Sequence, residues 1–173
     1  EIKECDWSSD VCSSDLAPNI IITRDLIVNG VSNTTIMNSA TTTQKLRLRI
    51  GDDFQQNATN SNFTIARSLG AVTMYVTDSI SLNAGKFIGQ IDTTNSGIDS
   101  IFTGGSFYMN PPNVSDYFRI NYGTGATYFR CNGGFNLSGA PTGAGLGFVG
   151  VYASSGAMNF SVGGIYTQDR KST

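Results

Sequence analysis

The sequence predicts an all-β protein, and three observations carry that prediction. One stretch alternates strictly between apolar and basic residues, many further short runs are rich in β-branched and aromatic residues, and Gly, Asn, Asp or Pro separates nearly all of these runs. Nowhere do apolar residues recur at helical spacing for long. We expect many short antiparallel strands, arranged as a β-sandwich, as the shaft or knob of a fibre, or as a segment of a β-solenoid.

The clearest single strand is predicted at Lys45–Ile50, which reads KLRLRI. Alternate residues of a strand point to opposite faces, so the apolar and the basic residues separate completely. A slip of one residue would bury two guanidinium groups in the core. We therefore expect Leu46, Leu48 and Ile50 to point inward and the two arginines between them to point outward.

Further strands are expected where β-branched and aromatic residues cluster between turn residues. Glu and Lys, the usual helix formers, are almost missing, and Asn38–Gln44 is the one place where a helical turn is allowed. The expected strands are Ile20–Ile22, Leu26–Val28, Asn62–Ala66, Val72–Thr77, Ser79–Leu82, Lys86–Ile91, Ser106–Met109, Tyr117–Tyr122, Ala126–Arg130, Gly147–Tyr152 and Met158–Val162.

Short phrases recur along the chain. Leu26–Gly30, Leu82–Gly85 and Phe135–Gly139 each end a strand on a small polar residue and then Gly, and Tyr117-Phe-Arg is echoed eleven residues later from Tyr128. Two interpretations are open. The echoes can be hairpin turns, which favour Gly at a positive φ, or they can mark a stack of short β-units, none of which buries its own face alone.

Both ends of the chain resemble translated sequencing adapter rather than protein. Asp6–Leu16 reads DWSSDVCSSDL, which eleven consecutive codons of the adapter used for short-read DNA libraries encode, and Asp169–Thr173 reads the same adapter from the opposite strand. We exclude residues 1–16 and 169–173 from the fold. A single β-rich domain or fibre segment is expected at 17–168, as a fragment of a longer chain. Trp7 and Val11 should pack against nothing in it.

The composition of residues 17–168 differs from that of the whole chain. These residues hold 8 Lys+Arg, 7 Asp and no Glu, so the net charge of −2 becomes about +1. No nucleic-acid partner is expected from this balance. Asn, Ser, Thr and Gly fill the surface instead, as is common in extracellular and virion β-structures. No apolar run approaches the roughly 18 residues that a membrane helix needs, so no membrane insertion is expected.

Cys131 is the one cysteine within residues 17–168. A single cysteine rules out an intrachain disulfide framework and a cysteine metal cluster. We expect one buried thiol.

Catalytic chemistry has few candidates in this sequence. The absence of His excludes the usual Ser-His-Asp and Cys-His arrangements and His-based metal sites. Without Glu in residues 17–168, a glycosidase would need two Asp side chains from separate strands. Each candidate lies in or beside a turn signal, where Asp is expected for its local hydrogen bonds, and we expect no catalytic residues. The candidates are Asp52, Asp53, Asp92, Asp99 and Asp116.

Two short motifs match ligand sites only in part. Gly145–Gly150 fits G-x-G-x-x-G, but a Pro/Gly-rich stretch precedes it and a strand-like run continues it, so we interpret its glycines as part of a β segment. Asp92–Thr103 begins like a calcium loop, yet Thr103 occupies the position that needs a bidentate Glu. No cofactor and no cofactor-binding or metal-binding residues are expected.

A group of aromatic residues has two interpretations. The rings could line a surface that stacks on a sugar or a receptor, or they could form core and cross-strand pairs, which alternating strands favour. The group consists of Phe107, Tyr108, Tyr117, Phe118, Tyr122, Tyr128 and Phe129.

The phrases DLIVNGVSNTT, NFTIARSLGAVTMYVTDSISLNAGKFIG and TGATYFRCNGGFNLSG resemble bacteriophage tail fibres, especially those that end in a self-cleaving chaperone domain. The resemblance implies a trimeric β-rich shaft or knob that displays a host-binding tip. No chaperone domain is visible in the sequence, so self-cleavage is not carried over.

The expected function is therefore a structural and adhesive segment of a virion tail fibre that displays loops for host attachment and has no enzymatic activity. Its expected partners are two further copies of the chain in a homotrimer and a glycan or protein receptor on the host surface. A secreted adhesin or carbohydrate-binding β-sandwich at a cell surface is the second hypothesis. A β-solenoid polysaccharide lyase or hydrolase is the third.

Overall fold

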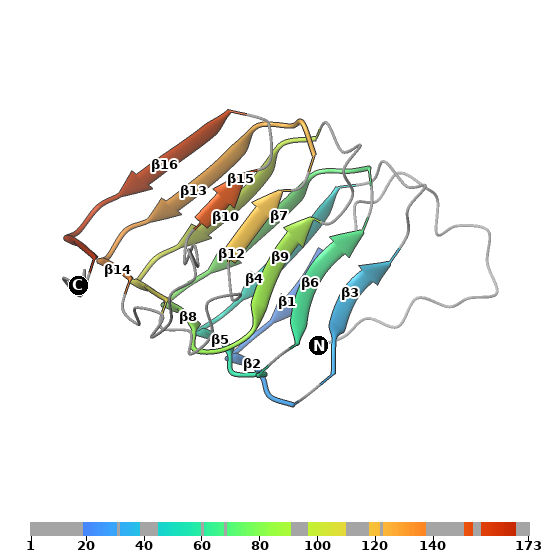
Figure 1. Cartoon of the computed structure of the whole chain (residues 1–173), viewed down its shortest axis with the longest axis horizontal. Helices are drawn as coiled ribbons and strands as arrows, with labels where there is room; N and C mark the ends of the chain where they lie inside the picture. Colours follow the sequence, from blue (N-terminus) through green and yellow to red (C-terminus); the bar gives the residue numbers. More distant parts are fainter. Residues whose placement is uncertain are drawn as a thin grey trace, which may run out of the picture.

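The chain of the computed structural model winds into stacked coils, and each coil adds one strand to each of three parallel sheets (Figure 1). The structure describes residues 19–30, 32–38, 45–59, 61–67, 69–90, 97–109, 118–121, 123–137, 151–153 and 157–168. Within them every strand pair is parallel, and the pairs keep one register throughout except at a shift between Arg119 and Asn121 where residues 118–121 pair with 151–153. The described part of the chain is a segment of a β-solenoid.

The three sheets take their strands in turn along the chain. Sheet A contains β1 (Asn19–Ile22), β4 (Leu46–Ile50), β7 (Val72–Val76), β10 (Asp99–Thr103), β13 (Thr127–Cys131) and β16 (Met158–Val162). Sheet B contains β2 (Leu26–Val28), β5 (Phe54–Gln56), β8 (Ile80–Leu82), β11 (Phe107–Met109), β14 (Phe135–Leu137) and β17 (Tyr166–Gln168). Sheet C contains β3 (Thr34–Asn38), β6 (Asn62–Arg67), β9 (Lys86–Gln90), β12 (Phe118–Asn121) and β15 (Val151–Ala153).

These elements confirm the all-β class and, among the expected architectures, the β-solenoid segment. All twelve expected strands overlap strands of the structure, whereas β3, β5, β10, β14 and β17 were not expected. The expected antiparallel pairing is wrong, because each strand pairs in parallel with the strand of the same sheet in the next coil. Asn38 ends β3, and the rest of the expected helical turn lies outside the described residues, as do both terminal stretches with Trp7 and Val11.

The alternation of β4 fixes which side of sheet A faces the core. Leu46, Leu48 and Ile50 are at most 1% exposed, while Arg47 and Arg49 are exposed, as predicted. Since the strands are in register, the same positions point inward in the neighbouring strands of the sheet.

Phenylalanine rings stack through the core in successive coils. Phe63, Phe87 and Phe118 occupy one position of sheet C and are buried. The Phe87 and Phe118 rings lie 4.1 Å apart between centroids at 9°, and Phe107 and Phe135 of sheet B lie 4.8 Å apart at 11°. Each such pair contributes roughly 0.5–1.5 kcal/mol beyond the burial of its area. In-register stacking thus repeats one favourable contact from coil to coil.

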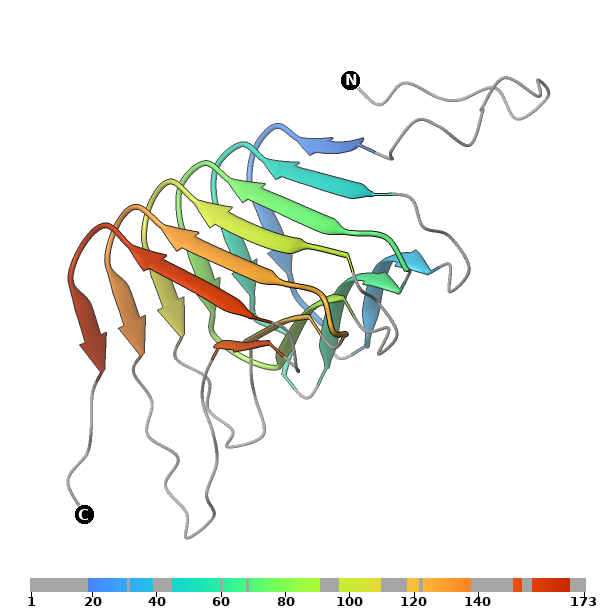
Figure 2. The same ribbon diagram turned by 90° about the horizontal axis from the view of Figure 1, so that it is seen from above.

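The corners between sheets A and B stack in one row (Figure 2) and are tied together by polar side chains. The backbone N–H of Asp53 donates to Oδ1 of Asp25 at 3.0 Å, and that of Ser79 donates to Oδ1 of Asp53 at 2.8 Å. The N–H groups of Ser106 and Gly134 donate in the same way to Oγ of Ser79 and Oγ of Ser106. One corner position therefore forms a continuous ladder of hydrogen bonds.

Asparagine side chains form a second ladder, directly after three strands of sheet B. Nδ2 of Asn57 donates to Oδ1 of Asn29 at 3.1 Å, and Nδ2 of Asn83 donates to Oδ1 of Asn57 at 2.8 Å. Asn29 and Asn83 belong to two of the recurring phrases, so the stacked-unit interpretation is confirmed for them and the hairpin interpretation is wrong. The Tyr-Phe-Arg echo has another origin, because Phe118 and Arg119 of the first copy lie in β12 and the second copy lies in β13, and these strands belong to different sheets.

Gly85 and Gly30 both have a positive φ, of 71° and 128°. A Cβ at Gly85 would lie 2.3 Å from the carbonyl oxygen of Ala58 and 2.6 Å from that of Ser61, whereas a Cβ at Gly30 would meet nothing within 4 Å. Gly85→Ala should lower the free energy of unfolding by about 2–5 kcal/mol, from backbone strain plus overpacking. The control Gly30→Ala should lower it by about 1–2 kcal/mol. Equal losses in urea denaturation would contradict the packing of Gly85 against the preceding coil.

Gln56 is a polar residue in the core, and among the described residues neither the nitrogen nor the oxygen of its side-chain amide has a hydrogen-bond partner. Leu82 occupies the same position in the next coil. Gln56→Leu should therefore raise the free energy of unfolding by about 1–3 kcal/mol, because an unpaired buried amide is replaced by an apolar side chain of similar size. The half-buried Gln55 points outward, and Gln55→Leu should change stability by less than about 0.5 kcal/mol. A loss of stability in Gln56→Leu would refute this assignment.

Candidate functional site

The outer face of sheet A arranges side chains in two parallel rows. Alternate residues of its strands point outward, and the register aligns them across neighbouring strands. The first outer row consists of Asn19, Arg47, Thr73, Ser100, Tyr128 and Asn159. The second outer row consists of Ile21, Arg49, Tyr75, Phe102, Arg130 and Ser161.

Three cations lie together on this face. Lys45 directly precedes β4, and Lys45, Arg47 and Arg49 are all exposed. Residues two apart on a strand are separated by roughly 6.5–7 Å, so the three side chains form a line along the strand. We call these three residues the cationic line.

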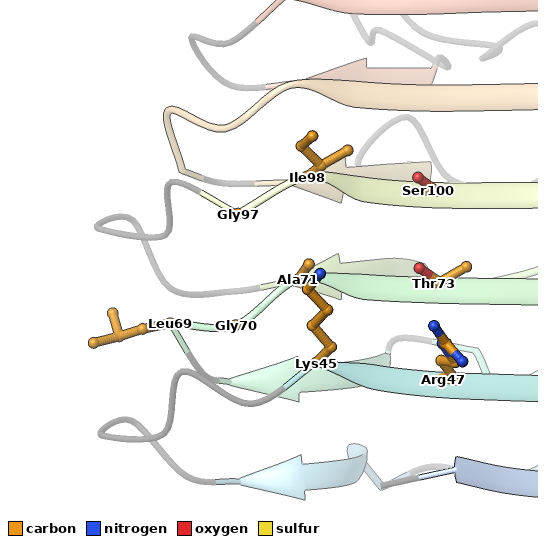
Figure 3. A pocket seen from close by; sticks show the side chains of 9 residues that line it. All are labelled: Lys45, Arg47, Leu69, Gly70, Ala71, Thr73, Gly97, Ile98 and Ser100. Atoms are coloured by element: carbon orange, nitrogen blue, oxygen red, sulfur yellow. The ribbon is translucent and has the colours of Figure 1, made fainter. Parts of the chain in front are cut away.

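Two shallow hollows flank Arg47. One, of about 390 Å³, is lined by Asn19, Arg47, Arg49 and Tyr75. The other, of about 560 Å³, has Lys45, Arg47, Thr73 and Ser100 in its lining (Figure 3). In Figure 3 the side chains of Arg47, Thr73 and Ser100 lie on successive strands, and Lys45 extends toward Ala71. The outer face of sheet A thus offers cations beside an amide group in one hollow and beside hydroxyl groups in the other, with Arg47 common to both.

The rim of the larger hollow is formed by residues that directly precede the strands. These residues are Leu69, Gly70 and Ala71 before β7, and Gly97 and Ile98 before β10. The side chain of Ile98 is exposed.

An aromatic pair lies beside these hollows in the second outer row. The rings of Tyr75 and Phe102 stack at 5.1 Å and 18°, so that one face of each ring is turned toward the other. Neither residue was among the aromatic candidates, although the alternation in VTMYV and DSIFT places both outward. Such a pair stabilises the sheet as a cross-strand contact.

The aromatic candidates from the sequence are divided between core and surface. Phe107, Phe118 and Phe129 are buried in the core. Tyr108 and Tyr128 are 44% and 39% exposed, on the outer faces of sheets B and A respectively. The remaining two, Tyr117 and Tyr122, lie outside the described residues.

The described candidate carboxylates are placed apart. Asp53 belongs to the corner ladder after β4, and Asp52 is exposed in the same corner. Asp99 lies at the opposite end of sheet A, where β10 begins, and is fully buried. Asp92 and Asp116 lie outside the described residues.

The two partial ligand motifs are described only in small part. Gly145–Gly150 and Asp92–Ser96 lie outside the described residues. Thr103, at the Glu position of the calcium-like loop, is buried in β10, and its Oγ1 donates a hydrogen bond to the carbonyl oxygen of Asp78. In the part of the chain that the structure describes, no three His, Cys, Asp or Glu side chains are grouped so that they could hold a metal ion.

Cys131 is a free, buried thiol, as expected. Burial raises the pKa of its thiol above the ordinary value, and the hydrogen bonds from the backbone offset this only in part. Its Sγ donates to the carbonyl oxygen of Gly105 at 3.3 Å. A thiol with a raised pKa is a weak nucleophile, which fits a structural role in the core.

Comparison with known proteins gives no relative: no family model, no curated protein and no solved structure matches the chain. Over the described ranges, the structure has no helix with the length and apolar character to span a membrane.

Asp99 contributes to stability through its contact with the preceding coil. Its Oδ1 accepts a hydrogen bond from the buried backbone N–H of Val72 at 2.7 Å. Asp99→Ala removes this acceptor and should lower the free energy of unfolding by about 1–3 kcal/mol. Asp99→Asn retains an acceptor oxygen and should lose less. Urea denaturation of both variants checks the order, and an Asp99→Ala protein as stable as the parent would show that the contact is dispensable.

Proposed function

We propose that the chain is a structural and adhesive segment of a fibre, of the kind found in bacteriophage tails, and that it acts by assembly and surface binding without catalysis. The observation that carries the proposal is the solenoid itself, a stack of coils that presents aligned rows of side chains on the outer face of sheet A. Stacked repeats of this kind form extended surfaces that serve for binding.

The solenoid bears on the homotrimer that the resemblance to tail fibres implies. In a solenoid each strand pairs with the strand of the next coil of the same chain, so the described sheets leave no row of unpaired edges along the stack for further copies to cover. The homotrimer stays a prediction about oligomeric state.

The two alternative functions differ in how they fit the fold. The β-sandwich form of the second hypothesis is wrong, because the described sheets form a solenoid, while an adhesin built as a solenoid would use the same outer face. A polysaccharide lyase fits the fold class. However, the described hollows contain cations without a carboxylate beside them, and we favour binding over cleavage for that reason.

The oligomeric state tests the assembly. Light scattering of the full chain should give three times its 18.4 kDa mass. A folded parent protein whose mass equals that of one chain at every concentration would contradict the fibre.

A further inference from the structure

The cationic line is not needed by the fold. Outward positions of sheet A require only side chains that tolerate water, and the strands on either side of β4 use neutral residues there. Asn19 and Thr73 flank Arg47, while Ile21 and Tyr75 flank Arg49. Three of the 8 Lys and Arg residues within 17–168 thus lie on one strand face.

These cations are not neutralised by an ion pair within the described part of the chain. Over the described residues, neither a salt bridge nor a hydrogen bond is formed by Lys45, Arg47 or Arg49. No acidic side chain occurs in the two outer rows of sheet A. An unpaired guanidinium with five donors in a rigid fork is suited to a carboxylate or a similar oxyanion.

The two hollows extend this cationic surface across four strands. They share Arg47 and run from Asn19 of β1 to Ser100 of β10, a width of roughly 14 Å at about 4.8 Å between strands. Besides the cations, Asn19, Thr73 and Ser100 offer amide and hydroxyl groups. A ligand with both negative charges and many hydroxyl groups would satisfy all of them.

We propose that this surface, centred on Arg47, binds an acidic polysaccharide, with Arg47 and Arg49 on its carboxylates and Thr73 and Ser100 on its hydroxyl groups. The proposal names the ligand of the adhesive function above and rests on it. A single-stranded nucleic acid fits less well, because its bases need open aromatic faces. The rings of Tyr75 and Phe102 instead turn one face toward each other, and the net charge of about +1 is far from strongly basic.

Polygalacturonate is the probe, with its fully methyl-esterified form as the neutral control of the same backbone. Titration calorimetry on the full chain should show binding of the acidic form alone, weakening as salt rises. Arg47→Gln/Arg49→Gln should weaken it at least tenfold. Arg47→Lys/Arg49→Lys keeps the charge but loses the bidentate fork and should fall between parent and Gln variant. If Arg47→Gln/Arg49→Gln lowers the thermal midpoint of unfolding, the affinity of the parent is compared with that of Arg47→Lys/Arg49→Lys instead.

Arg130→Gln is the matched control, because Arg130 lies on the same face but outside both hollows, where its Nε donates to Oδ1 of Asn132. The affinity of Arg130→Gln for polygalacturonate should stay within twofold of that of the parent. No binding of polygalacturonate, or equal binding by the Arg47/Arg49 variants, would overturn the proposal. Tighter binding of single-stranded DNA, lost in the Gln variant, would also overturn it in favour of a nucleic-acid site.

Two further readouts separate this proposal from the fibre. Light scattering of the same samples shows whether assembly persists when binding is lost. A parent protein that assembles but does not bind polygalacturonate contradicts the proposed ligand and leaves the proposed fibre standing. Ultraviolet absorbance would report an unsaturated uronate, the product of β-elimination. Its appearance would support the binding site but overturn the proposal that the chain does not catalyse.

Discussion

The structure depends on one constraint, the in-register parallel stacking of each strand on its counterpart in the next coil. Because side chains alternate at every residue, a slip of one position would exchange the inward and outward sets of a whole strand. In β4 that slip would bury Arg47 and Arg49 and expose Leu48. Register therefore determines the phenylalanine stacks of the core, the aspartate-serine and asparagine ladders at the corners, and the rows on the outer face of sheet A.

The same constraint links the core to the proposed binding surface. The inward residues of β4 lock the strand in place, and the outward residues are then held at strand spacing with little freedom to rearrange. A flat, rigid face of this kind presents Arg47 beside Thr73 and Ser100 without any loop to order on binding. At the end of the stack, register has the opposite effect, since Phe160 continues a buried position but has no following coil among the described strands to cover it.

How far the sequence could predict this fold depended on how clearly each strand alternates. KLRLRI showed both faces of β4, whereas Phe54-Gln-Gln did not identify β5, because a buried Gln56 imitates a surface residue. Strand direction was hidden, since a corner and a hairpin both use Asn and Gly. The repeat was visible only in part, because some stacked positions share a residue type, as in the asparagine ladder, while others share only burial: Gln56 lies between Val28 and Leu82. The cationic line could be recognised from the sequence of β4 alone. The hollows could not, because they depend on residues 26 to 28 positions away from Arg47 in the chain, which only the register brings beside it.

Disulfide trapping tests the register most directly. Thr73 and Ser100 are paired on the outer face of sheet A, at the roughly 4.8 Å spacing that a disulfide spans. With Cys5 and Cys12 replaced by serine, Thr73→Cys/Ser100→Cys should oxidise to a disulfide within the chain. Thr73→Cys/Phe102→Cys, shifted by two residues and about 8 Å apart, should stay reduced. Efficient trapping of the shifted pair, or none of the aligned pair, would contradict the in-register parallel stack.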